Sequence, residues 1–225
     1  AKPGRVTGFL GPNGAGKSTC MRMMTGLTPP TRGHATILGK DYSKLDNPGR
    51  HVGVLLDASA QHVGRTGHEV LTIGAKTMGL PADRVTEILD VVGLTPAEAK
   101  RRVGDYSLGM RQRLGLAGAL MGDPEVLILD EPQNGLDPQG IIELRDLVRN
   151  LADEGRTVVV SSHQLGEIAR INVPVTVLAW IDDPAHPVST AEELSRVLPR
   201  ASLSVARTPQ DVQEWPSVLC RDVAG

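Results

Sequence analysis

The segment that most constrains this chain lies ten residues from its start and reads GPNGAGKS over residues 11–18. It fits the pattern G-x-x-x-x-G-K-[ST] at every fixed position. Glycines in such a loop let backbone N–H groups converge on an anion. Lys17 can then reach the β- and γ-phosphates, and the Ser18 hydroxyl can hold Mg²⁺. The pattern therefore predicts a site for a nucleoside triphosphate.

The flanking residues favour the same interpretation. Residues 5–10 are predicted to form a short strand, and residues 18–25 the first turns of a helix. A strand–loop–helix order directs the loop N–H groups and the positive end of the helix dipole at one phosphate. The alternative is a glycine-rich turn that binds no ligand.

Composition limits the classes of protein to consider. The chain has 225 residues, a net charge of −2 and two cysteines. This length suits one ordinary core, and the small net charge gives no electrostatic support for a nucleic-acid partner. The longest apolar run, residues 173–181, is too short to cross a membrane. Two cysteines do not make a disulfide framework, which favours a reducing compartment, and Cys20 is predicted to be a small core residue.

Apolar runs alternate with amphipathic segments along the chain. We predict a mainly parallel α/β sheet flanked by helices. Residues 57 to about 115 contain helical patterns without strong strands, and they are predicted to form a helical subdomain packed on the sheet. The strands are expected at residues 5–10, 35–38, 51–56, 125–129 and 157–161, and the helices at 18–25, 67–78, 82–92, 109–121, 139–152 and 164–170.

A second motif carries two adjacent acids. Residues 126–129 are four consecutive apolar residues, followed by Asp130 and Glu131. In open α/β sheets the carboxyl end of a strand lies beside the ligand crevice. Asp130 could hold Mg²⁺ there, usually through water, and Glu131 could act as general base toward an attacking water. Alternatively, the two acids only cap a strand.

Three further segments bear a family resemblance. Residues 106–112, YSLGMRQ, are similar to the signature motif L-S-G-G-Q of ATP-binding cassette (ABC) proteins. Residues 132–137 resemble the D-loop of that family, and residues 161–163 its His switch. Together with the phosphate loop (Walker A) and the strand with two acids (Walker B), they occur in the family's order over most of residues 4–170.

The resemblance implies a phosphate-loop NTPase fold in one nucleotide-binding domain over residues 1–225, with the signature motif on the helical subdomain. It implies ATP and Mg²⁺ as ligands. Two such domains would pair head to tail, as a homodimer or with a second cassette, each signature motif closing over ATP held by its partner. His163 would lie near Glu131 and the γ-phosphate, and Mg²⁺ would be held by Ser18, Asp57 and Asp130. The residues expected to bind ATP are Gly11, Pro12, Asn13, Gly14, Ala15, Gly16, Lys17, Ser18, Thr19, Ser107 and Gly109.

The chain departs from the family pattern at four places. Asp57 stands where the family places the glutamine of its Q-loop, with Gln61 four residues later. Leu108 and Met110 replace the usual signature residues, although Ser107 keeps its hydroxyl. The aromatic residue that stacks on adenine lies upstream of Walker A in the family, so we expect this sequence to lack the N-terminal strands. Residues 171–225 diverge and are given no function.

The function that the resemblance implies is that of the ATPase subunit of an ABC transporter of the bacterial drug or bacteriocin exporter type. It would hydrolyse ATP at the cytoplasmic face of the membrane, bound to a separate permease subunit, and no nucleic-acid partner is expected. Two alternatives are a soluble non-transport cassette acting on the ribosome or DNA, and a truncated cassette that binds nucleotide weakly without hydrolysis.

Overall fold

The computed structural model describes residues 1–10, 14, 16–162, 175–180, 188–189, 192, 196, 201–208 and 211. The helix predicted at residues 164–170 lies outside these residues.

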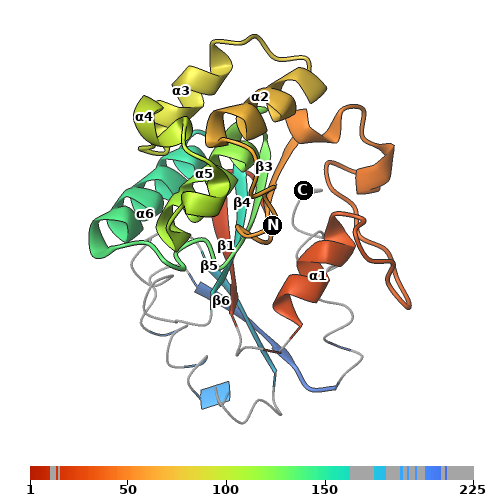
Figure 1. The fold of residues 1–225 in the computed structure, drawn as a ribbon. Coiled ribbons are helices and arrows are strands. Elements are labelled where there is room, and N and C mark those ends of the chain that lie inside the picture. The colour runs from red at the N-terminus through yellow and green to blue at the C-terminus, as the bar shows by residue number, and fades with distance from the viewer. Residues whose placement is uncertain are drawn as a thin grey trace.

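A four-stranded sheet forms the centre of the structure (Figure 1). Its strand order is β1-β4-β3-β2, and every neighbouring pair is parallel. The carboxyl ends of the four strands therefore meet at one edge of the sheet, where ligands bind in folds of this kind. The strands are β1 (Arg5–Leu10), β2 (Val52–Leu55), β3 (Val126–Asp130) and β4 (Thr157–Ser162).

The prediction of a strand at residues 35–38 is wrong. Only an isolated antiparallel bridge joins Ile37 to Lys40. Leu38 has a φ of 53° and Gly39 a φ of 75°, so the chain turns back on itself instead of extending. The run of apolar residues did not reveal this turn.

The helices lie on both faces of the sheet (Figure 1). Helix α1 covers one face, and α5 and α6 lie on the other. The α-helices are α1 (Lys17–Met24), α2 (Gly67–Thr77), α3 (Arg84–Val91), α4 (Pro96–Ala99), α5 (Leu108–Leu120) and α6 (Pro138–Asp153). Short 3-10 helices occupy Tyr42–Lys44, Pro48–Arg50 and Val103–Asp105.

Side chains of the central strands alternate between two hydrophobic cores, as the pleat of a strand requires. On β3, Leu127 and Leu129 pack on the side of α2, α3, α5 and α6, whereas Val126 and Ile128 pack on the side of α1. A strand buried on both faces is apolar at consecutive positions, which is why the sequence pattern was informative here. The core on the α1 side contains Phe9, Cys20, Met21, Met24, Val52, Val126, Ile128 and Val159.

Helix α5 packs unusually close to β2. A Cβ added at Gly53 would lie 2.1 Å from the carbonyl oxygen of Ala119. Only glycine fits at that position, so the backbone of the helix can approach the strand. The helical segment between β2 and β3 is thereby held against the sheet.

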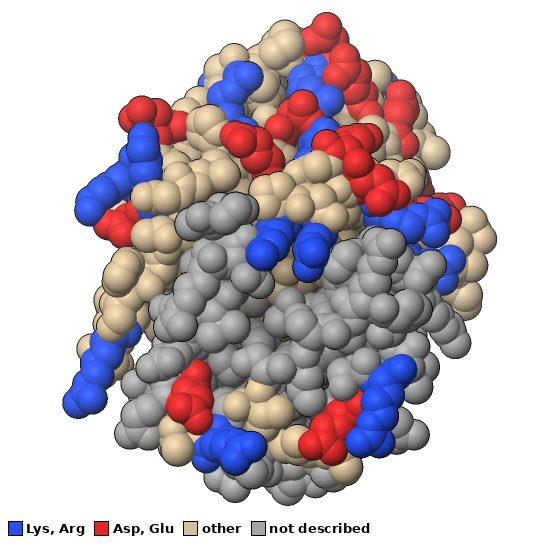
Figure 2. All heavy atoms as spheres, turned by 180° about the vertical axis from the view of Figure 1, so that it is seen from behind, with Lys and Arg blue, Asp and Glu red and all other residues tan. Residues whose placement is uncertain are grey.

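Near the carboxyl end of the described chain, β5 (Val175–Trp180) and β6 (Ala201–Ala206) form a separate two-stranded parallel sheet, and β5 lies beside β1. None of the helices within the described residues is long and apolar enough to cross a membrane. On the face seen in Figure 2, basic and acidic side chains are interspersed over the described upper part, and neither sign dominates there.

Candidate functional site

The phosphate loop runs from the end of β1 into α1. Gly14 and Gly16 have φ values of 87° and 86°, a left-handed backbone that favours glycine. Gly16 is the N-cap of α1, and Lys17 is its first residue. Ser18 and Thr19 are exposed on the first turn, so their hydroxyls are accessible at the helix N-terminus. The predicted residues Gly11, Pro12, Asn13 and Ala15 lie outside the described part of the chain.

The loop lysine meets the second predicted motif. The Lys17 Nζ atom lies 3.5 Å from the Oε1 atom of Glu131. Both side chains are largely buried, with exposed fractions of 6% and 15%. Residues that are 114 positions apart in the sequence thus form one charged site at the carboxyl edge of the sheet.

Glu131 has an uncommon backbone conformation. Its φ is 47°, in the left-handed region that non-glycine residues rarely occupy. Its N–H donates to the Ser161 hydroxyl at 2.9 Å, and its carbonyl accepts from the Gln112 side-chain amide at 3.3 Å. The Ser161 hydroxyl in turn donates to the carboxylate of Asp130, the last residue of β3. Side chains from β4 and α5 therefore fix both the backbone N–H and the backbone carbonyl of Glu131.

Gln133 contacts the carboxylate itself. Its Nε2 atom donates to Glu131 Oε2 at 3.3 Å and to the Ser162 hydroxyl at 2.9 Å. Sequence reasoning missed both Gln133 and Gln112 as members of the site. Both lie in segments that resemble family motifs, but the motifs gave no role to their side chains, because their partners are set by the way in which β3, β4 and α5 come together.

The signature segment begins helix α5. Ser107 is the N-cap, and its hydroxyl accepts from the Met110 N–H at 3.2 Å. The preceding Tyr106 is buried and its hydroxyl donates to the Glu98 carbonyl at 2.8 Å. Burial raises the pKa of Tyr106, so its hydroxyl stays protonated as a donor. Ser107 is exposed beside this anchor, and its cap is open to a ligand or a partner.

The signature segment also contacts the residues after Glu131. A Cβ added at Gly109 would lie 2.8 Å from the Gly135 carbonyl oxygen. Gly135 has a φ of 76°, and the chain then enters α6 through Asp137, whose carboxylate accepts from the Gly140 N–H at 3.1 Å. The predicted signature and D-loop segments are therefore packed backbone to backbone.

The positions of two predicted site residues, Asp57 and His163, relative to Lys17 and Glu131 are less closely defined. Asp57 is exposed shortly after β2, and its carboxylate accepts from the Ser59 N–H at 2.7 Å in a local turn. Because Leu55 is paired with Leu129, Asp57 follows the same sheet edge as Asp130. His163 lies outside the described residues, directly after the last residue of β4. Gln61, the alternative to Asp57, lines a groove on the helical side.

The donor set suits the predicted ligands. Hydroxyl and carboxylate oxygens, as offered by Ser18 and Asp130, are the ligands that Mg²⁺ prefers. A lysine at the start of α1 and a carboxylate after a neighbouring strand suit a triphosphate and an attacking water. The parallel sheet, the glycine loop and these charged groups define the phosphate-loop class of nucleotide-binding α/β proteins.

Comparison with known proteins narrows this class. The chain belongs to the ABC transporter family, whose sequence pattern matches residues 1–134. It is 46% identical over 173 residues to the bacitracin transport ATP-binding protein BcrA of Bacillus licheniformis, covering 76% of this chain and 56% of that protein. It is 39% identical to the lantibiotic transport ATP-binding protein SrtF of Streptococcus pyogenes, covering 75% of this chain and 72% of SrtF. The chain spans about half the length of BcrA.

Solved structures agree with the fold. One, described as an ATP binding subunit of an ABC transporter, aligns with a TM-score of 0.68 at 27% identity, over 78% of this chain and 75% of that one. Another is cbiO1 from Clostridium perfringens, part of the ABC transporter complex cbiONQ. It aligns with a TM-score of 0.63 at 31% identity, over 78% of this chain and 73% of that chain. The predicted family and fold class are confirmed.

Proposed function

We propose that this chain is the ATP-binding and ATP-hydrolysing subunit of a bacterial exporter of the drug or bacteriocin type. The observation that carries the proposal is the contact between Lys17 and Glu131 at the carboxyl edge of the sheet. It brings a phosphate-binding cation and a candidate general base into one site. The names of the bacitracin and lantibiotic transport relatives support the exporter assignment.

The residues divide the work of hydrolysis. Lys17 exchanges Glu131 for the β- and γ-phosphate oxygens when ATP binds. Glu131 accepts a proton from the water that attacks the γ-phosphorus in line, and the bond to the β–γ bridging oxygen breaks to release ADP and phosphate. When bound, Mg²⁺ neutralises phosphate charge, and Ser18 and Asp130 would hold it, with Asp57 near the same edge.

The remaining predicted residues complete a composite site. Thr19 and the loop N–H groups bind phosphate from the same chain. Ser107 and Gly109, at the N-terminus of α5, bind the phosphate of ATP held by a second cassette. The resemblance gives His163 the role of contacting the γ-phosphate. These assignments extend the resemblance to positions that the chain shares with the family.

Two substitutions test the assignment of Lys17 and Glu131. Lys17→Ala should abolish ATP binding, because the phosphates lose their cation. Glu131→Gln should retain binding but lower the hydrolysis rate by about 10²- to 10⁴-fold, the usual contribution of a general base. Fluorescent ATP-analogue binding and steady-state phosphate release measure the two effects.

Lys44→Ala is the matched control, since Lys44 is exposed and pairs locally with Asp41 at 2.6 Å. Its binding and rate should equal those of the parent chain. Unchanged ATP affinity in Lys17→Ala, or parental turnover in Glu131→Gln, would refute the respective assignment.

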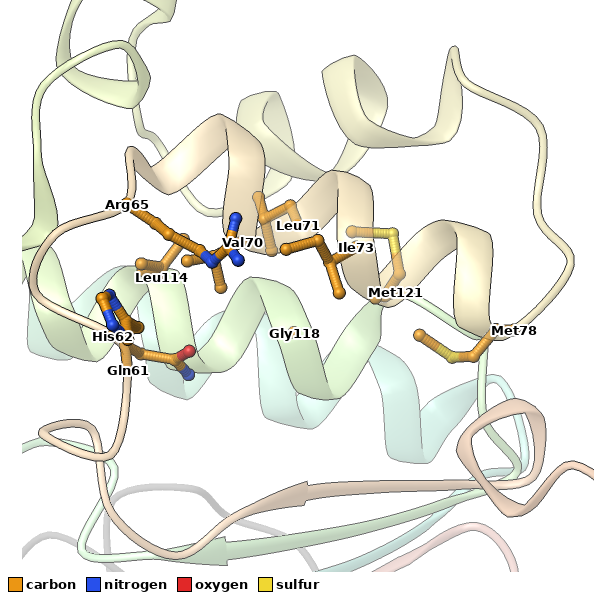
Figure 3. Close-up of a pocket in the computed structure, with 11 residues that line it drawn as sticks. Gln61, His62, Arg65, Val70, Leu71, Ile73, Met78, Leu114, Gly118 and Met121 are labelled. Carbon is orange, nitrogen blue, oxygen red and sulfur yellow. The ribbon is translucent and has the colours of Figure 1, made fainter.

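We also propose the surface to which a permease subunit binds. A groove of about 390 Å³ lies between α2 and α5. Figure 3 shows Gln61, His62 and Arg65 at one end, with Met78 at the other. The wall between them is apolar, and Ile73 on this wall remains 45% exposed. An amphipathic helix from the cytoplasmic side of a permease fits an apolar groove with a polar end, and would hold the chain at the membrane.

Ile73→Asp tests this surface by placing a charge on the apolar wall. Co-purification with the permease should be lost while ATP binding by the chain alone is unchanged. Ile142→Asp on α6 is the control, because Ile142 is similarly exposed at 41% but lies outside the groove. Equal recovery of permease with both variants would place the contact elsewhere.

A further inference from the structure

We propose that Gln133 is a positioning residue that orients the Glu131 carboxylate for proton abstraction. The inference rests on the proposed role of Glu131 in hydrolysis. Gln133 lies two residues after Glu131, within the segment that resembles the D-loop, and that resemblance assigns no role to its side chain. Its contacts suggest one.

The amide of Gln133 is fully used as a donor. An amide nitrogen carries two hydrogens, and Nε2 of Gln133 has two acceptors, Glu131 Oε2 at 3.3 Å and the Ser162 hydroxyl at 2.9 Å. Gln133 is 8% exposed and Ser162 is 1% exposed. The planar amide is therefore fixed between the carboxylate and β4, where water competes little for its hydrogens.

The two oxygens of the carboxylate have different partners. Oε1 lies near Lys17, and Oε2 accepts from Gln133. When nucleotide binds, Lys17 has to contact phosphate oxygens, so its ion pair with Oε1 of Glu131 is lost. The contact with Gln133 comes from the loop and strand that build the site, and it does not have to be exchanged for a phosphate oxygen.

The backbone of Glu131 is already held. Ser161 accepts from its N–H, and Gln112 donates to its carbonyl. The freedom that remains is rotation about the side-chain bonds of Glu131, and the Gln133 amide restrains that rotation. A misplacement of about 1 Å in a reacting group can cost about 100-fold in rate, so a loss of this restraint should appear in kcat.

Two substitutions in the full chain remove the contact in different ways. Gln133→Met keeps an unbranched side chain of similar size without a donor. Gln133→Asn keeps the polar amide but is one methylene shorter, which guards against a folding defect. We expect kcat for ATP hydrolysis to fall about 10- to 100-fold in both, with KM and fluorescent ATP-analogue affinity within about threefold of the parent.

A glutamine elsewhere provides the matched control. Gln139 is exposed on α6 and its amide also donates to a carboxylate, Glu143 Oε1, at 3.2 Å. Gln139→Met should leave kcat unchanged. Parental kcat in either folded Gln133 variant, or an equal loss in Gln139→Met, would overturn the proposal.

The variant Glu131→Ala distinguishes an effect of Gln133 through the Glu131 carboxylate from a general effect on the fold. In that background Gln133→Met should lower the residual rate no further, because it acts through the missing carboxylate. A fold loss equal to that in the parent would overturn the proposal. If Glu131→Ala itself hydrolyses ATP at the parental rate, the proposed function fails instead, so the two failures are distinguishable.

Discussion

At the scale of single residues, Glu131, the proposed general base, has an unfavourable left-handed backbone conformation. A left-handed backbone costs an L-residue roughly 1–2 kcal/mol relative to the right-handed one. Here it directs the carboxylate toward Lys17 at the sheet edge. Such outliers persist where surrounding contacts over-determine them, and Ser161 and Gln112 provide those contacts.

A pair of substitutions isolates this backbone cost. Glu131→Gly and Glu131→Ala both remove the side chain and its contact with Lys17, but only glycine relaxes at a φ of 47°. We expect the glycine variant to have a free energy of unfolding about 1 kcal/mol higher than the alanine variant. Urea denaturation of the two variants measures the difference. An alanine variant of equal or greater stability would mean that the conformation carries no strain.

At the scale of elements, the close approach of α5 to β2 fixes the distance between the signature helix and the sheet. Gly53 makes the approach possible, since an added Cβ would also lie 2.9 Å from the side chain of Leu127. Backbone and core atoms on both sides leave no room for relaxation. Gly118, on the same helix, has nothing within 4 Å of an added Cβ.

These two glycines give opposite predictions for the same substitution. Gly53→Ala should destabilise the fold by about 1–3 kcal/mol through overpacking. Gly118→Ala should stabilise it by up to about 1 kcal/mol, because alanine is the better helix former. Thermal unfolding of both variants is the measurement, and a stability order in which Gly53→Ala matches Gly118→Ala would contradict the close packing.

The elements also show what the sequence can predict. The strands predicted at residues 125–129 and 157–161 correspond to β3 and β4, and they were predictable because burial on both faces makes consecutive residues apolar. The predicted strand at 35–38 failed because the positive φ of Leu38 left no mark on the apolar pattern. Motif spacing placed Lys17 and Glu131 in one site, whereas the contact of Gln133 with Ser162 depends on β3 lying beside β4 in register.

At the scale of the whole molecule, a head-to-tail pair would join the phosphate loop of one chain to the signature segment of the other. Ser107 is exposed at the cap of α5, as binding a partner's nucleotide requires. A site shared between two chains allows complementation, which a site within one chain does not. Two chains with different defects can restore one site between them.

Mixing two inactive variants tests this arrangement. Lys17→Ala removes the cation of the phosphate loop, and Ser107→Arg blocks the N-cap of α5. Each homodimer should therefore be inactive. In a mixed pair, one site combines the intact loop with the intact cap, and an equal mixture should recover about a quarter of the parental rate. Phosphate release measures the recovery. A mixture as inactive as its components would argue for a site within a single chain.

The contact between Gly109 and Gly135 has a further consequence for such a pair. A Cβ added at Gly109 would meet the carbonyl oxygen of Gly135, and a Cβ added at Gly135 would meet the side chain of Leu108. The two segments therefore leave little space to absorb a small displacement. A shift of the loop after Glu131 on one nucleotide would be transmitted to the cap that covers the other. Communication between the two nucleotides would then pass through this contact, and a methyl group added at residue 109 or 135 would be enough to alter it.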